Sequence, residues 1–243
     1  MTDYILPGEQ INRDGFAVID AVYTDIEIMH LLSLLSVTDT SRPAFRKTKD
    51  LFAIRQFFRE VPDAADIVFN DVLKQLVARL SGDDFFVVKS IYFDKPGDSN
   101  WFVPWHQDLT ISVNKKVDTA GYGPWTIKHN QYAVQPPLDI LQDNFTIRIH
   151  LDATDHSNGA LRVIPGSHLN GIRRPESIDL KDETAVVCTV PKGGVMIMKP
   201  LLLHASGRTL NHQPRRVIHI EFSRSKLPAG LEWAELMTVS SCS

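Results

Sequence analysis

From residue 85 onward, apolar and polar residues alternate with a period of two, and this pattern constrains the fold more than any other feature of the sequence. Side chains of a β-strand point alternately to opposite faces, so the alternation is typical of strands with one buried face. Gly, Pro and Asn residues separate the short segments, which favours a sandwich or a barrel. The segments with this pattern are 85–93, 104–113, 145–153, 160–166, 185–190, 194–199, 201–206 and 215–223.

The first 85 residues have a different, mostly helical pattern that follows a short strand at 15–20. Thr24 and Glu27 have the spacing of a capping box, which predicts a helix beginning at Thr24. Asp63 can cap a second helix, whose apolar residues repeat at helical spacing until Gly82 stops it. We therefore expect a single domain over 1–243 that is mainly β with flanking helices. The helices would lie mostly in 1–85 and the β region in about 85–225.

Charge and composition exclude several classes of protein. The net charge is −3 and no basic stripe is present, so nucleic acid is not an expected partner. No apolar run is long enough to span a bilayer, and the N-terminus lacks the pattern of a signal peptide. The two cysteines form no CxxC pair, which fits a reducing compartment. We expect a cytoplasmic protein, a monomer or weak homodimer, that binds a small molecule and no membrane.

One long stretch, 114–143, shows neither period. A loop of this length inside a compact domain is usually functional, so we interpret it as a lid over a substrate pocket. It contains Trp125, His129 and Tyr132 among its glycines and prolines. The alternative is an ordered surface loop that touches no substrate.

Two histidines and an aspartate suggest a metal site. His106 and Asp108 are two residues apart in a predicted strand, so they would share a face, with Gln107 opposite. His204 ends an apolar run and can supply a second imidazole. Two His and one carboxylate form the facial triad of non-haem iron(II) oxygenases. A tripeptide HxD is common by chance, and the other histidines, among them His219, have an ordinary interpretation in loops or strands.

The residues that follow His204 strengthen this interpretation. Ser206 would share its face, and Arg215 follows after eleven residues at the start of the last clear strand. Alternation puts only one of Arg215 and Arg216 inside, and we expect Arg216 to point outward. A buried arginine needs an anionic partner. The far carboxylate of 2-oxoglutarate can pair with it in a bidentate manner while the 2-oxo acid end chelates iron.

These residues lie in segments that resemble the phytanoyl-CoA dioxygenase family of iron(II)/2-oxoglutarate oxygenases. The segments are WHQD (105–108), SNGALRVIPGSH (157–168) and HASGRTLNHQPRR (204–216), in the order typical of the family. The stretch 93–113 is similar to a bacterial subgroup. The resemblance extends from about residue 10 to about 223.

The resemblance implies a double-stranded β-helix, that is, a cupin-like jelly roll with helices packed on one sheet. It implies Fe(II), 2-oxoglutarate and O₂ as reactants, with release of succinate and CO₂. The iron ligands would be His106, Asp108 and His204. The contacts to 2-oxoglutarate would be Arg215, Ser206 and Ile91.

Four further residues are candidates for the pocket. Gln107 belongs to the HQD motif but alternates away from the metal. Arg148 stands where the human family member has a tryptophan. It would bind an acidic group of cosubstrate or substrate, or else form an ion pair with a neighbouring carboxylate. Trp125 and Arg55 complete this set. Halogenating relatives replace the carboxylate ligand with a small residue, so Asp108 favours hydroxylation over halogenation.

Two other functions stay open at this point. One is a jelly-roll metal enzyme of another class, such as an isomerase or a thiol oxygenase, which would need no interior arginine. The other is a non-catalytic sensor of a small molecule, which would need no open metal positions. A zinc hydrolase is disfavoured because the sequence has no HExxH motif. The substrate itself is not predicted.

Overall fold

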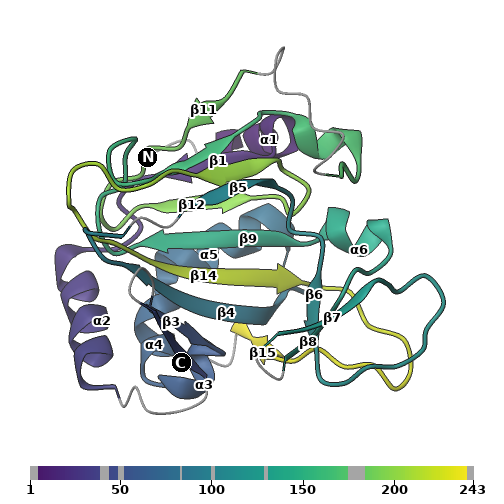
Figure 1. Ribbon diagram of the computed structural model, residues 1–243. Helices are drawn as coiled ribbons and strands as arrows, with labels where there is room; N and C mark the ends of the chain where they lie inside the picture. The colour runs from purple at the N-terminus through teal and green to yellow at the C-terminus, as the bar shows by residue number, and fades with distance from the viewer. Residues whose placement is uncertain are drawn as a thin grey trace.

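The structure, a computed structural model, describes residues 5–38, 44–48, 52–82, 84–99, 102–128, 131–174 and 184–239. Its largest component is an eight-stranded sheet, the major sheet, in which every pair is antiparallel. Seven strands lie side by side in the order β1 (Phe16–Ile19), β12 (Val195–Met198), β9 (Phe145–His150), β14 (Arg215–Ser223), β4 (Phe86–Lys95), β3 (Phe52–Arg55) and β2 (Phe45–Lys47) (Figure 1). The eighth strand, β15 (Met237–Thr238), pairs with β4.

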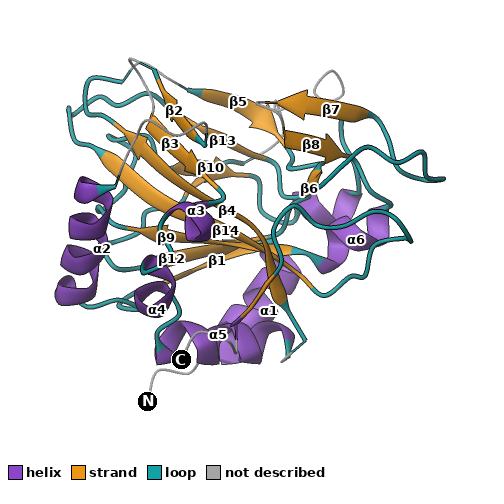
Figure 2. Ribbon diagram, turned by 90° about the horizontal axis from the view of Figure 1, so that it is seen from below, coloured by secondary structure: helices purple, strands orange, loops and turns teal. Residues whose placement is uncertain are grey.

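Two smaller antiparallel sheets complete the β architecture. The minor sheet has the order β11 (Val186–Val187), β10 (Leu161–Val163), β13 (His204–Ser206) and β5 (Val103–His106). The third sheet consists of β6 (Ile111–Val113), β8 (Gln131–Val134) and β7 (Trp125–Lys128). In Figure 2, β5, β13 and β10 lie on one side of the major sheet, and α1, α4 and α5 lie on the other. The prediction of a mainly β fold with flanking helices is confirmed.

Helices cover the face of the major sheet that lies away from the minor sheet. They are α1 (Ile5–Asp14), α2 (Asp25–Val37), α3 (Phe57–Glu60), α4 (Ala64–Val68) and α5 (Asp71–Ser81), with α6 (Leu138–Asp143) at the end of the third sheet and a short 3-10 helix at Ser167–Asn170. No helix of the described residues is long and apolar enough to cross a membrane.

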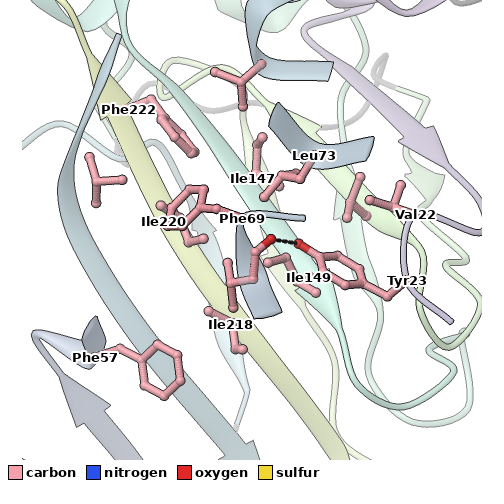
Figure 3. Close-up of a cluster of buried hydrophobic side chains, with 14 of the residues drawn as sticks. Val22, Tyr23, Phe57, Phe69, Leu73, Ile147, Ile149, Ile218, Ile220 and Phe222 are labelled. Atoms are coloured by element: carbon pink, nitrogen blue, oxygen red, sulfur yellow. Dashed lines mark hydrogen bonds between the residues drawn. The ribbon is translucent and has the colours of Figure 1, made fainter. Parts of the chain in front are cut away.

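The main hydrophobic core lies between these helices and the sheet. Alternate residues of β9 and β14 point into it, among them Ile147, Ile149 and Ile220, each 0% exposed (Figure 3). Tyr23 joins the core from the helical layer, and its hydroxyl donates a hydrogen bond of 2.6 Å to the carbonyl oxygen of Val68. Full burial of one isoleucine side chain contributes about 1.5–3 kcal/mol to the stability of the fold. The other residues of β9 and β14 are thereby directed to the opposite face of the sheet.

The predicted helix starts are partly confirmed. Thr24 caps α2, and both hydrogen bonds of its capping box with Glu27 are present. The single helix expected over 63–82 is wrong, because it is divided at Phe69 and Asn70. Asn70 has extended backbone angles and caps α5 by accepting a hydrogen bond from Leu73 N. An asparagine in this conformation ends one helix and begins the next. Gly82 ends α5 as predicted.

Two predictions in the β region also need correction. The strand expected over 104–113 is interrupted, since β5 ends at His106 and β6 begins at Ile111. The lid loop expected over 114–143 is not structureless, because β7, β8 and α6 all lie within it. β8 pairs with both β6 and β7, and the three elements are only four to six residues long, which is too short for a visible periodicity in the sequence. His129 lies outside the described residues.

Candidate metal centre and its cavity

Two strands of the minor sheet bring His106 and His204 together. Antiparallel pairing of β5 with β13 places the two residues directly opposite each other. Their ring centroids are 4.2 Å apart. The His204 side chain is 6% exposed and that of His106 is 33% exposed. One imidazole therefore lies inside the molecule while the other borders solvent.

Backbone carbonyl groups fix the tautomers of both rings. His106 Nδ1 lies 2.8 Å from the carbonyl oxygen of Pro104, and His204 Nδ1 lies 2.9 Å from that of Leu202. A carbonyl oxygen only accepts, so each Nδ1 carries the proton and donates it. Each Nε2 is then left with a free lone pair, which is the form of histidine that binds metals.

Asp108 completes a triad although it lies beyond the end of β5. Its Oδ1 is 3.8 Å from His106 Nε2, and its Oδ2 is 3.7 Å from His204 Nε2. These distances are too long for hydrogen bonds. One ligand atom of each residue lies within 4.8 Å of the others. The donor set, two neutral imidazoles and a carboxylate, fits iron(II).

The loop after β5, and not strand alternation, determines the position of Asp108. Its backbone N–H donates to the carbonyl oxygen of Pro200 at 2.9 Å. The Gln107 side chain is buried and donates to the carbonyl oxygens of Leu201 and Gly171 at 2.6 and 2.9 Å. Its Oε1 accepts from Arg173 N at 2.7 Å. Gln107 thus points away from the triad, as expected, and anchors the chain on the turn between β12 and β13.

The charge state of the triad follows from its surroundings. Burial is the main reason that the pKa of His204 falls to about 4, so its ring is neutral at pH 7. Burial has the largest single effect and opposes ionisation of Asp108, but the nearby positive charges, first that of His204 and then that of His219, together outweigh it and lower the pKa of Asp108 to about 2. Lys89 acts in the same direction. At neutral pH the triad therefore offers a carboxylate and a neutral, deep imidazole.

The triad opens into a cavity of about 260 Å³ between the major and minor sheets. Ser206 and Arg215, both predicted contacts of the cosubstrate, line this cavity and are buried. Ile91, the third, lines it from β4. Arg148 lines it from β9, on the face opposite the core residues Ile147 and Ile149. The structure therefore brings these four residues and the triad into one space.

Arg215 is buried in this cavity without an adequate partner. Its Nε and Nη1 atoms are inaccessible and make no hydrogen bond within the described residues. Burial, followed by the nearby charge of Arg148, lowers the pKa of Arg215 to about 9, so the guanidinium stays charged at pH 7. Arg216 points outward and forms a bidentate pair with Asp152 at 2.8 and 2.6 Å, as alternation predicts. A charged group left unpaired in this way is suited to an anionic ligand.

A chain of polar side chains crosses the inner face of the major sheet. Arg148 Nη1 lies 3.0 Å from His219 Nδ1, and His219 Nε2 lies 3.1 Å from Glu221 Oε1. Arginine only donates, so Nδ1 of His219 is the acceptor and its Nε2–H donates to Glu221. Lys89 Nζ pairs with the same Glu221 oxygen at 2.7 Å. Arg148 therefore bonds a neutral histidine, and its own Nε has no partner among the described residues.

Two pocket candidates lie elsewhere. Trp125 is in β7, where it packs against a separate hydrophobic cluster that includes Val134 and Ile111, and it does not line the cavity. Arg55 is in β3 and is half-buried next to Ile91, just outside the residues that line the cavity. Sequence reasoning missed Lys89, Glu221 and the connecting role of His219. The sequence feature that could have revealed them is the presence of polar or charged residues at the cavity-facing, alternate positions of otherwise apolar strands.

Comparisons with known proteins agree with this geometry. A family model described as phytanoyl-CoA dioxygenase matches residues 11–217. The chain belongs to the phytanoyl-CoA dioxygenase family. That match includes the triad and Arg215, so the site lies in the part of the chain that the family shares. No curated protein sequence matches this member of the phytanoyl-CoA dioxygenase family.

Solved structures show the same fold at low sequence identity. The apo form of EctD from S. alaskensis is 19% identical with a TM-score of 0.68, over 89% of this chain and 75% of that one. AviO1 from Streptomyces viridochromogenes Tue57 is 21% identical with a TM-score of 0.64, over 94% and 98%. SnoN, an alpha-ketoglutarate-dependent epimerase of nogalamycin biosynthesis, is 14% identical with a TM-score of 0.66, over 90% and 82%. The predicted jelly-roll fold of this phytanoyl-CoA dioxygenase family member is confirmed.

Proposed function

We propose that the protein is an iron(II)- and 2-oxoglutarate-dependent oxygenase that hydroxylates a small organic molecule. The observation that carries this proposal is the buried Arg215, which shares a cavity with the His106–Asp108–His204 triad and has two nitrogen atoms without a partner among the described residues. Family membership supports the same chemistry. EctD was solved with 2-oxoglutarate and 5-hydroxyectoine, and SnoN with Fe³⁺ and alpha-ketoglutarate.

The triad would hold the metal without rearrangement of its tautomers. His106 and His204 would each use Nε2, because their Nδ1 protons are already donated to carbonyl oxygens. Asp108 would contribute a carboxylate oxygen between them. Iron(II) and 2-oxoglutarate together supply O₂ activation, with succinate and CO₂ as co-products. The protein contributes ligands, orientation and a cavity from which water is partly excluded.

Arg215, Ser206 and Arg148 would orient the cosubstrate. Arg215 would pair with the far carboxylate, and the Ser206 hydroxyl would donate a hydrogen bond to it. Arg148 is close enough to Asp108 and to Arg215 for their charges to influence one another. It would therefore lie along the cosubstrate between its two ends. His219 would hold the Arg148 guanidinium in place through the hydrogen bond at Nδ1.

The test is an anaerobic titration of the metal-free protein with iron(II) and then 2-oxoglutarate. We expect a weak visible charge-transfer band that His106→Ala abolishes and Arg215→Ala weakens or shifts. Arg216→Gln is the matched control, because this neighbour points outward to Asp152, and its band should equal that of the wild type. No band in wild-type protein that demonstrably binds iron would refute the use of 2-oxoglutarate. The protein would then be a jelly-roll metal protein of another class.

A second measurement addresses catalysis. With iron, 2-oxoglutarate and O₂ present, candidate substrates should increase the rate of succinate release, and the organic product should gain one oxygen atom. A product of unchanged oxygen content would keep the oxygenase core but replace hydroxylation with another oxidation. A band without any stimulated succinate release across a broad panel would instead favour a sensor.

A further inference from the structure

Arg55 is a third arginine, besides Arg148 and Arg215, that lies on the cavity face of the major sheet and has a buried nitrogen without a partner among the described residues. In β3, Ile54 points into the helix-side core, so Arg55 and Ala53 point to the opposite face. Arg55 pairs in register with Ile91, which lines the cavity. Arg46 of β2 pairs with Ala53 and shares that face. Arg55 and Arg46 therefore form a pair of cations beside the cavity.

Nothing in the described residues neutralises this pair. Arg55 Nε is buried and makes no hydrogen bond. Neither Arg55 nor Arg46 forms an ion pair with a described carboxylate. Burial and the charge of Arg46 both lower the pKa of Arg55, which shows that the two cations repel each other. An oxyanion that bridged them would remove both the repulsion and the unsatisfied donor.

The cosubstrate does not meet this need, for reasons of position and of charge. The register of the strands puts four residues in one row across the sheet: Arg55, Ile91, His219 and Arg148. Neighbouring strands are about 4.8 Å apart, so the Arg55 and Arg148 backbones are separated by roughly 14 Å. A 2-oxoglutarate molecule held by Arg148 and Arg215, as proposed above, would lie at the far end of this row. Its two negative charges would also be balanced by the two positive charges of iron(II). The excess of positive charge at Arg55 and Arg46 on the cavity face of the major sheet would therefore persist.

We propose that Arg55, assisted by Arg46, binds an oxyanion group of the primary substrate, which is therefore a small carboxylic acid or phosphate monoester. The substrate would lie between Arg55 and the triad, with the carbon to be oxidised near His106 and Asp108. The side chains of His106 and Asp108 are each about one-third exposed, which leaves room for a substrate beside them. This inference rests on the proposed oxygenase function, because it assigns the second occupant of the same cavity.

The test uses protein loaded with Zn(II) and 2-oxoglutarate, which cannot turn over, and labelled with ¹⁵N at arginine. The Arg55 Nε–H resonance is assigned by its loss in Arg55→Lys. Benzoate, phenyl phosphate and the neutral benzamide serve as probes. We expect benzoate or phenyl phosphate to shift this resonance saturably and benzamide to leave it unchanged. The stronger of the two acids identifies the substrate class.

The variants make the assignment specific. Losing a hydrogen-bonded charged donor should weaken binding of the acid about 10- to 100-fold in Arg55→Gln, measured by isothermal titration calorimetry because this variant has no Arg55 resonance. The effect in Arg46→Gln, followed on the Arg55 resonance, should be smaller, because Arg46 is more exposed. Arg59→Gln, an exposed arginine of α3, is the control and should bind like the wild type. Equal shifts with benzamide, no shift with either acid, or an unaltered Arg55→Gln protein would overturn the proposal.

A separate measurement distinguishes failure of this substrate-anion proposal from failure of the proposed oxygenase function on which it rests. Arg55→Gln loaded with iron(II) should keep the charge-transfer band of 2-oxoglutarate at wild-type affinity. Loss of that band would assign Arg55 to the cosubstrate and overturn the substrate-anion proposal. Absence of the band in the wild type would instead refute the oxygenase function, whatever the arginine resonance does.

Discussion

Replacing Arg215 with methionine should make the ligand-free protein more stable while it weakens binding of 2-oxoglutarate. Among the described residues, Nε and Nη1 of Arg215 are buried without partners, and unsatisfied buried donors of this kind cost about 1–3 kcal/mol. Methionine fills a similar volume without polar atoms, so we expect a gain of about 1–3 kcal/mol in the free energy of unfolding. The lost bidentate pair should cost about 2–4 kcal/mol of binding, which weakens affinity by roughly 30- to 1,000-fold.

Two assays on the same preparation measure these effects. Urea denaturation of metal-free protein gives the free energy of unfolding, and anaerobic titration of the charge-transfer band gives the affinity for 2-oxoglutarate. Arg215→Lys is a second test variant, because it keeps the charge but loses the forked geometry of the guanidinium. Its affinity for 2-oxoglutarate should therefore lie between those of the wild type and of Arg215→Met. A methionine variant that is less stable than the wild type and binds 2-oxoglutarate normally would refute the reasoning. Arg215 would then be a structural residue.

Three further predictions concern the triad, a buried histidine of β9 and the polar chain through His219. Asp108→Ala should weaken iron binding sharply in chloride-free buffer, measured by equilibrium dialysis, while circular dichroism stays unchanged. His150 is buried and neutral in the fold, its pKa lying well below 6.5 mainly through burial, so the unfolded state takes up the proton first as pH falls through 6.5. The wild type should thus lose about 1.4 kcal/mol of stability at this residue between pH 7.5 and 5.5, and His150→Gln should lose less in denaturation curves measured at both pH values. His219→Gln can accept from Arg148 and donate to Glu221, so it should retain affinity for 2-oxoglutarate, whereas equal weakening by His219→Gln and His219→Leu would contradict the assigned tautomer.

The parts of the fold that follow from the sequence are those with a strong local signal. The strand 215–223 was predicted with the bounds that β14 has, because its alternation is long and uninterrupted. The capping box at Thr24 depends only on two residues and was also correct. In contrast, the strands and helix within 114–143 are four to six residues long, and the two strands are stabilised by a sheet in which β8 pairs with β6 and β7, which no local pattern encodes. The division of the helix at Asn70 depends on tertiary hydrogen bonds to Val22 and Glu27.

The candidate site shows the same limit. Alternation sufficed to turn Arg215 inward and Arg216 outward. The grouping of His106 with Asp108 was correct, but for the wrong reason, since a loop anchored by Gln107 supplies the proximity. The polar chain through His219 could not be foreseen, because it joins residues of three strands that are distant in sequence. Register between strands, not pattern within them, decides such contacts.

Strand β14 has a consequence for how this protein can diversify. Its odd-numbered residues from Arg215 to Glu221 face the cavity, while Ile218, Ile220 and Phe222 face the core. A one-residue insertion or deletion would exchange the two faces, so the length of this segment is under strict constraint. Point substitutions at the odd positions, however, change ligand recognition without removing a core side chain. Single replacements at a position outside the polar chain, such as Val217, can therefore change substrate preference while the helix-side core stays intact.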